Sequence, residues 1–235
     1  MGICQSNKKN VYISNFIETQ EAVDFLINGA LFSSNELDSS HDYIYYKTPE
    51  QKLIGPPSYP RCFIQPFGWT AIALNVSKKY DNGDDGWLGN SNLKGEWYIG
   101  YHGIKKMDAI HNIYLNGFRR GPNQECEKYD NINPLTKNKY PKCGVGAYFA
   151  QDVNDALYFT SPIKYSGHNY RVVFMARLNP QRVRIAETKQ GLNRDYMIVN
   201  GDLLDDNNAT PKIDEVRPYK ILLKKEINYH SNPFC

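Results

Sequence analysis

Short apolar and aromatic runs, separated by polar segments, fill the second half of the chain. They are rich in Val, Ile, Tyr and Phe and therefore typical of strands. We predict strands at Trp97–Tyr101, Val145–Phe149, Arg171–Leu178, Val183–Ala186, Tyr196–Val199 and Pro218–Leu223. Helical spacing of apolar residues predicts helices at Met107–Asn116 and Asp152–Phe159. Because strands outnumber helices and gather late in the chain, the pattern indicates an α+β domain with a largely antiparallel sheet.

The first half of the chain has a different pattern. Apolar residues mixed with acidic and amide residues over Asn15–Asn28 predict an amphipathic helix that ends at Gly29. Residues 33–60 are rich in Ser, Asp, Pro and Tyr, which is typical of a surface segment. Aromatic and β-branched residues at helical spacing predict a second helix over residues 68–79.

These patterns divide the chain into three parts. Residues 1–14 form an N-terminal tail, and residues 15–95 form a helical and loop region that packs on the core. Residues 96–228 form the domain that contains the predicted strands. Within it, the polar segment 119–142 is too long for a simple connection and is more typical of a functional loop.

Composition narrows the class of protein. The chain has 235 residues, a hydrophobic content of 41% and a net charge of +3, which suits one substantial core and does not by itself indicate a nucleic-acid partner. No apolar stretch approaches the ~18 residues that a membrane-spanning helix needs. Five cysteines without a Cys-x-x-Cys pair favour neither a disulfide framework nor a zinc site. We therefore expect no metal cofactor and a cytoplasmic location.

The N-terminus carries a separate signal. Met1-Gly2-Ile3-Cys4-Gln5-Ser6 fits the pattern for N-myristoylation of Gly2, and Cys4 is placed where a palmitoyl chain could be added. One acyl chain gives only marginal binding, on the order of 10⁴ M⁻¹, so stable anchoring needs a second signal. The alternatives are an unmodified tail and anchoring to the cytosolic face of a membrane, and the sequence favours anchoring.

Three of the strand segments carry one polar side chain at an edge. These are Tyr101-His102-Gly103, Gly144-Val145-Gly146-Ala147-Tyr148-Phe149-Ala150 and Asp195-Tyr196-Met197-Ile198-Val199. Glycine lets its backbone approach a ligand closely, tyrosine rings can stack on a flat group, and a carboxylate can stabilise a developing positive charge. These positions are therefore candidates for one site.

In their order along the chain and in their local sequence, these segments resemble the catalytic domain of poly(ADP-ribose) polymerases and their mono-ADP-ribosylating relatives. The similarity covers about Trp97 to Lys225. It implies a split, mostly antiparallel sheet with flanking helices. It also implies that the chain binds NAD as a substrate and transfers ADP-ribose from it to an acceptor.

The resemblance also implies roles for single residues. His102 matches the histidine that hydrogen-bonds a ribose hydroxyl, and Gly103 matches the glycine whose backbone reads the carboxamide. Tyr148 matches the second-motif tyrosine, and Tyr158 matches the tyrosine that stacks on nicotinamide from the other side. Arg119 lies at the start of what looks like the donor loop, where an arginine approaches the adenosine half.

The chain departs from the family pattern at three positions. Asp195 stands where the polymerases have glutamate, and its carboxylate is displaced by about 1.5 Å, roughly one C–C bond. A shift near 1 Å can cost ~10²-fold in a positioned reaction. Ile104 replaces a hydroxyl residue, and Asp155 replaces a serine that contacts the carboxamide, so Asp155 can accept from the amide N–H but not donate. The loss of glutamate favours mono-ADP-ribosylation.

We therefore expect a mono-ADP-ribosyltransferase with His102, Tyr148 and Asp195 as its catalytic residues and NAD bound by His102, Gly103, Arg119, Tyr148, Asp155 and Tyr158. Two alternatives stay open, namely a non-catalytic module that binds NAD or ADP-ribose and an NAD glycohydrolase. The acceptor is unknown, and a protein is favoured over nucleic acid. Each motif alone is weak, because a lone histidine near a strand end is more often structural.

Overall fold

The computed structural model describes residues 19–46, 51–118, 131–132, 139–140, 146–186, 196–199 and 215–226. For Gln51, Ala186 and the ranges 131–132, 139–140 and 196–199 it describes the backbone alone.

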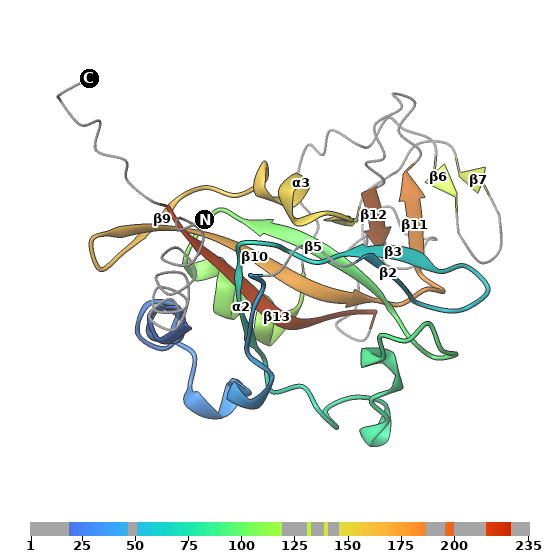
Figure 1. The fold of residues 1–235 in the computed structure, drawn as a ribbon, viewed down its shortest axis with the longest axis horizontal. Coiled ribbons are helices and arrows are strands. Elements are labelled where there is room, and N and C mark those ends of the chain that lie inside the picture. Colours follow the sequence, from blue (N-terminus) through green and yellow to red (C-terminus); the bar gives the residue numbers. More distant parts are fainter. Residues whose placement is uncertain are drawn as a thin grey trace, which may run out of the picture.

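One eleven-stranded sheet organises the described chain, and all of its strand pairs are antiparallel (Figure 1). Its order is β1-β4-β13-β10-β5-β8-β12-β11-β6-β7, with β9 paired to β10. The bounds are β1 Tyr43–Ile44, β4 Thr70–Ala73, β5 Tyr98–Ile104, β6 Asn131–Ile132, β7 Lys139–Tyr140, β8 Ala147–Ala150, β9 Ile163–Tyr165, β10 His168–Leu178, β11 Val183–Ala186, β12 Tyr196–Val199 and β13 Val216–Lys225. A separate hairpin consists of β2, Gln51–Ile54, and β3, Arg61–Ile64. The predicted α+β class with a mostly antiparallel sheet is confirmed.

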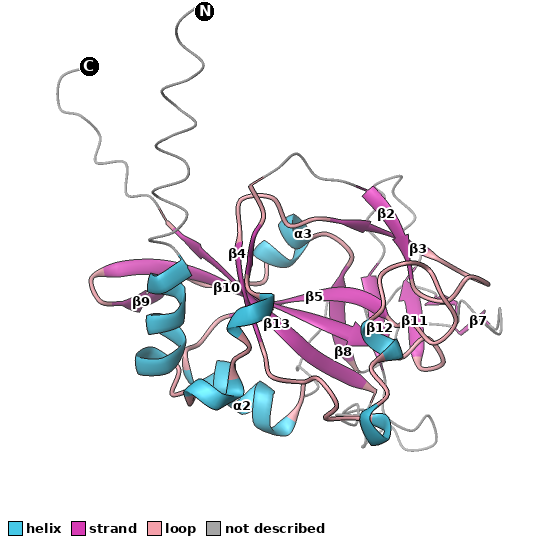
Figure 2. Ribbon diagram, turned by 60° about the horizontal axis from the view of Figure 1, so that its bottom comes forward, coloured by secondary structure: helices cyan, strands magenta, loops and turns pink. Residues whose placement is uncertain are grey.

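Few helices accompany the sheet (Figure 2). Residues 19–24 are helical and continue into the π-helix η1, Phe25–Gly29, so the predicted exit at Gly29 is correct. The helix α2, Asp108–Asn116, ends because Gly117 adopts φ 77°, a conformation that suits glycine. The short helix α3, Val153–Leu157, is capped by the Asp152 side chain, which accepts from the Asn154 N–H at 2.8 Å. Short 3₁₀ turns are η2 Ser34–Glu36, η3 Ser39–His41, η4 Asp81–Gly83 and η5 Gly86–Leu88.

The sheet separates two layers of packing. Phe118, just after α2, packs edge-on against Phe149 and Phe174, with ring centroids 4.9 and 5.7 Å apart. The ideal Cβ position at Gly103, which lies next to His102 on β5, points instead toward α3 and the residues that follow it. Because neighbouring residues of a strand point to opposite faces, α2 and α3 cover opposite faces of the sheet. The core lies on both sides of β10, whose last seven residues are all buried.

One prediction for the first half of the chain is wrong. Residues 68–79 do not form a helix, because Thr70–Ala73 form β4 between β1 and β13. All four residues of β4 are buried, so the segment is apolar on both faces, as an interior strand requires. The helical spacing of its large side chains therefore had no bearing on its structure, and burial within the sheet decided the outcome.

Candidate functional site

The three motif segments lie side by side. Strand β5 carries His102 and Gly103, β8 carries Tyr148, and β12 begins directly after Asp195, and these strands are consecutive in the sheet. Ala150 stands opposite Tyr101 on one side and opposite Tyr196 on the other. Tyr101, Ala150 and Tyr196 are therefore neighbours on three adjacent strands, although they are 46 residues or more apart in the chain.

Within the described residues, strands β5 and β8 pair only through Tyr101 and Ala150. Beyond this pair, toward His102 and Tyr148, the regular ladder stops. The His102 imidazole spans the two strands there, because its Nδ1–H donates to the backbone oxygen of Tyr148 at 2.8 Å. A carbonyl can only accept, so this bond fixes the proton of the neutral ring on Nδ1 and leaves Nε2 as an acceptor.

The His102 ring lies in an aromatic setting. Its centroid is 5.1 Å from that of Phe118 and 5.4 Å from that of Phe149. Burial lowers the pKa of His102 from its ordinary value of 6.5, and the hydrogen bond to Tyr148 opposes this only in part. The imidazole is therefore neutral at physiological pH. Among the residues that the structure describes, none forms a hydrogen bond with Nε2, which suits it to accept from a hydroxyl group of a ligand.

Gly103 and the Tyr148 side chain belong to the other face of the sheet. Phe149 shares the face of His102, so Tyr148, its neighbour, points the opposite way. A Cβ on Gly103 would lie 2.4 Å from the backbone oxygen of Ala156 in α3. The absence of a side chain at Gly103 thus allows α3 to pack closely on the face toward which Tyr148 points.

The structure therefore joins His102 and Tyr148 through a main-chain atom of Tyr148. Their two side chains lie on opposite faces of β5 and β8. A ligand that contacts both would have to lie across the place where these strands separate. This is a more specific arrangement than the sequence could indicate, because the motifs predict only which strands meet.

Helix α3 places two further predicted residues. Asp155 is buried in its first turn, and Tyr158, at its C-cap, has 76% of its surface exposed. Ile104, where the family pattern has a hydroxyl residue, is buried in the core and is 2% exposed. Its apolar side chain therefore has a packing role.

The β2–β3 hairpin lies beside this site, and sequence reasoning missed it. The Tyr101 hydroxyl donates to the Ile64 oxygen at 3.0 Å, and Gln151, directly after β8, donates from Nε2 to the Cys62 oxygen at 2.9 Å. Arg61 Nη2 donates to Gln151 Oε1 at 2.8 Å. Tyr101 shares the face of Gly103 by alternation, so the hairpin and α3 pack on the same face of the sheet. These contacts with distant main-chain atoms leave no periodic signal in the sequence.

Several predicted residues lie outside the described part of the chain. These are Asp195, Arg119 and the lipidation candidates Gly2 and Cys4. Tyr196, the residue that follows Asp195 in the chain, is described by its backbone and stands opposite Ala150 of β8. Within the described ranges, no three His, Cys, Asp or Glu side chains gather as a metal-binding group.

No model of a known protein family matches the chain, and no curated protein is similar to it at a significant level. Within the described residues, no helix has both the length and the apolar character needed to cross a membrane.

Proposed function

We propose that this chain is an NAD-dependent mono-ADP-ribosyltransferase. The observation that carries the proposal is the adjacency of β5, β8 and β12, with the His102–Tyr148 hydrogen bond at the point where β5 and β8 separate. The three motif segments of the resemblance are needed at one site, and the sheet puts their strands next to one another. A neutral histidine with an available acceptor nitrogen at that place supports a contact with a ribose hydroxyl.

In the proposed reaction, the bond between the nicotinamide nitrogen and C1 of its ribose breaks, and nicotinamide leaves as a neutral molecule. The ribose carries the developing positive charge in an oxocarbenium-like state. A nucleophilic group of the acceptor forms the new bond to C1 and loses its proton. Asp195 would stabilise the positive charge, because a carboxylate placed before the charge develops needs no reorganisation during the reaction. His102 Nε2 would accept from a ribose hydroxyl and hold the sugar in position.

The nicotinamide would lie beside the Gly103 backbone, where β5 and β8 separate. The Tyr148 side chain points to the face that α3 covers, and Tyr158 lies at the end of α3, which supports stacking on a flat ring. Asp155 would accept from the carboxamide N–H. Arg119 would approach the adenosine half of NAD, as the resemblance implies.

A non-catalytic module that binds NAD or ADP-ribose is the second candidate. Ile104 favours it, because this buried side chain cannot hydrogen-bond a ribose. The shorter reach of Asp195 also favours it. This candidate keeps the ligand contacts of His102 and Gly103 but predicts no turnover.

Purified protein incubated with NAD labelled in its adenylate part tests the proposal. Auto-modification, transfer to added protein and free nicotinamide are followed together. A transferase gives labelled protein, a glycohydrolase gives nicotinamide and free ADP-ribose, and a binding module gives neither. Asp195→Ala should strongly reduce nicotinamide release, whereas Asp195→Glu should retain or raise it because the longer side chain restores the reach. Equal activity of wild type and Asp195→Ala would remove Asp195 from the mechanism.

We further propose that the N-terminal tail anchors the protein to the cytosolic face of a membrane. Gly2 would carry the myristoyl chain and Cys4 the second acyl chain, because two chains dissociate slowly enough to hold a protein in place. Gly2→Ala should move the protein to the soluble fraction of host cells, and Cys4→Ser should move part of it. Mass spectrometry that finds an intact Met1 would exclude this anchor.

A further inference from the structure

Exposed lysines from three strand ends meet at one end of the main sheet. Lys224 is near the end of β13 and stands opposite Arg171 of β10. Lys164 of β9 stands opposite Asn169 of β10. Lys105 and Lys106 follow β5 where Ile104 stands opposite Val172. The start of β10 therefore brings together four exposed lysines, namely Lys105, Lys106, Lys164 and Lys224.

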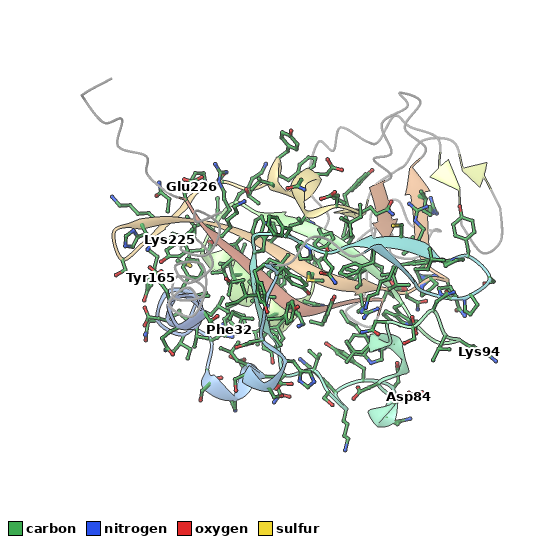
Figure 3. All side chains as sticks on the ribbon, viewed as in Figure 1. Phe32, Asp84, Lys94, Tyr165, Lys225 and Glu226 are labelled. Carbon is green, nitrogen blue, oxygen red and sulfur yellow. The ribbon has the colours of Figure 1, made fainter. Side chains whose placement is uncertain are left out.

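The acidic residues at this end are largely engaged within the protein. Lys225 Nζ lies 2.8 Å from Glu21 Oε1, and Arg171 Nε lies 2.6 Å from Glu226 Oε1. Figure 3 shows Lys225 and Glu226 at this end of the molecule. Of the other acids that the structure describes here, Asp24 accepts from the Tyr165 hydroxyl at 2.8 Å and Asp108 is exposed. Among the described residues, none of the four exposed lysines forms an ion pair, so an excess of positive charge faces solvent.

Exposed aromatic side chains flank these lysines. Phe67 is 54% exposed, and Lys224 Nζ lies 5.9 Å from the ring centroid of Trp69, two residues further on. Arg171, opposite Lys224, donates to the Thr160 oxygen at 3.1 Å, and Thr160 directly follows Tyr158 and Phe159. Those two side chains are 76% and 40% exposed. We call Phe67, Phe159 and the four lysines the basic–aromatic surface.

We propose that the basic–aromatic surface binds an anionic membrane. Exposed Phe side chains bury in the boundary between headgroups and acyl chains, and lysines near an anionic leaflet are attracted to its headgroups. A single-stranded nucleic acid would favour a groove that follows its backbone, whereas these cations come from separate strand ends and suit an array of headgroups.

The first described turn of the N-terminal helix lies at the same end of the sheet. Tyr170 and Lys225 both bind Glu21 in the first described turn of this helix, at 2.7 and 2.8 Å. The segment with the acylation pattern joins the described chain at Thr19, two residues earlier. Lipid on the tail and charge on the sheet end would thus act from one side of the molecule, as the two signals that stable anchoring requires.

Unacylated full-length protein from bacteria tests this proposal without the tail's lipid and without any need for transferase activity. Binding is measured by co-sedimentation with phosphatidylcholine vesicles that contain or lack phosphatidylserine. Each lysine near an anionic surface changes the affinity about fivefold, so Lys164→Gln/Lys224→Gln should bind about 25-fold more weakly. The matched control is Lys78→Gln/Lys94→Gln, which removes the same charge from exposed sites elsewhere, with Lys94 at the other end of the molecule in Figure 3.

A second variant, Phe67→Ser, separates interfacial insertion from charge. It should weaken binding even at high salt, where the contribution of the lysines is screened. Failure to bind phosphatidylserine vesicles would overturn the proposal, as would equal loss in the control double variant. Displacement of the vesicles by a single-stranded oligonucleotide at lower concentration would assign the surface to nucleic acid instead. Transfer of ADP-ribose in solution should be unchanged in the lysine variants, so failure of either proposal is recognised separately.

Discussion

His102 Nδ1 donates a hydrogen bond to the backbone oxygen of Tyr148 across 2.8 Å, at the place where β5 and β8 cease to pair. This bond does two things at once. It ties the Tyr148 oxygen to β5 beyond the last ladder pair of β5 and β8, and it determines which ring nitrogen can accept from a ligand. A structural and a functional role for His102 are therefore compatible, and different substitutions can separate them.

His102→Asn should keep the fold and lose the chemistry. The asparagine Nδ2 can take the position of Nδ1 and donate to Tyr148, whereas nothing replaces Nε2. We expect the free energy of unfolding to fall by about 1 kcal/mol and turnover of NAD to fall at least ~10²-fold. Thermal melting and nicotinamide release measure the two effects.

His102→Ala is the matched comparison, because it also removes the donor to Tyr148. It should destabilise the protein by a further ~1–3 kcal/mol, since the Tyr148 oxygen loses the donor on His102 and the aromatic cluster loses volume. Normal activity in His102→Asn would show that the ring serves the fold alone.

The pH dependence of stability should report the environment of His102. Its folded-state pKa lies below the ordinary value of 6.5 because burial disfavours the charged ring. Below about pH 6.5 the unfolded chain therefore binds more protons than the folded one, so stability falls as the pH falls through this range and is flat above it. The difference in free energy of unfolding between wild type and His102→Asn, measured in urea from pH 5 to 8, should shrink on the acid side. A difference that is independent of pH would mean that His102 titrates normally.

Gly103→Ala should disturb α3. The new methyl group would meet the Ala156 oxygen at 2.4 Å and the Phe159 carbonyl carbon at 2.9 Å, and both are backbone atoms that cannot rotate away. Overpacking of this kind costs about 1–3 kcal/mol, and we expect the upper end together with weaker NAD binding. Gly86→Ala is the control, because its nearest neighbour at 3.1 Å is the flexible Asp84 side chain. Equal small losses in both variants would show that α3 shifts without cost.

Much of the second half of the fold was predictable, and particular residues show why. β11 and β12 have the predicted bounds, and α2 ends at Asn116 as predicted, because each is a short pattern closed by clear signals. β4 was not predictable, since Trp69 and Ile72 show helical spacing and only pairing with β13 makes the segment a strand. Local pattern could not reveal that partner.

The site was predictable at the level of strands and not of side chains. The motif order predicts that the strands of His102 and Tyr148 meet, but the bond between the His102 ring and a backbone oxygen depends on how β5 and β8 separate. The position of the β2–β3 hairpin depends on Gln151 and Tyr101 binding main-chain atoms far away in sequence. Such contacts leave no periodic signal.

Two buried arginines lie opposite each other in the pair of β10 and β13, and no sequence pattern marked them. Arg177 faces Arg217, and they are 3% and 2% exposed. Arg177 donates to the Trp97 and Leu88 oxygens at 2.8 and 2.7 Å. Like charges directly opposite destabilise a sheet, so each guanidinium needs its own compensation.

Arg217 is compensated by Asp81 and by aromatic rings. Its two terminal nitrogens donate to the Asp81 carboxylate at 2.7 and 2.8 Å. Its guanidinium carbon lies 4.1, 4.4 and 4.8 Å from the ring centroids of Trp97, Tyr80 and Trp87. Asp81 itself adopts φ 48°, which is unfavourable for a residue with a side chain, so this ion pair also holds a strained turn.

Asp81→Ala should therefore destabilise the protein by roughly 2–3 kcal/mol. This is below the ~3–5 kcal/mol of a fully buried pair, because the Asp81 side chain is 48% exposed and water can reach the vacated side. The double variant Asp81→Ala/Arg217→Met should recover part of the loss, since methionine leaves no buried charge without a counter-ion. The hydrogen bond from Arg217 lowers the pKa of Asp81 below its ordinary 3.8, so the contribution of the pair is present above that pH and is lost as the pH falls further. Urea unfolding of the two single variants and the double variant measures the coupling. Additive losses would mean that the aromatic rings and the Arg177 environment, and not Asp81, compensate the charge of Arg217.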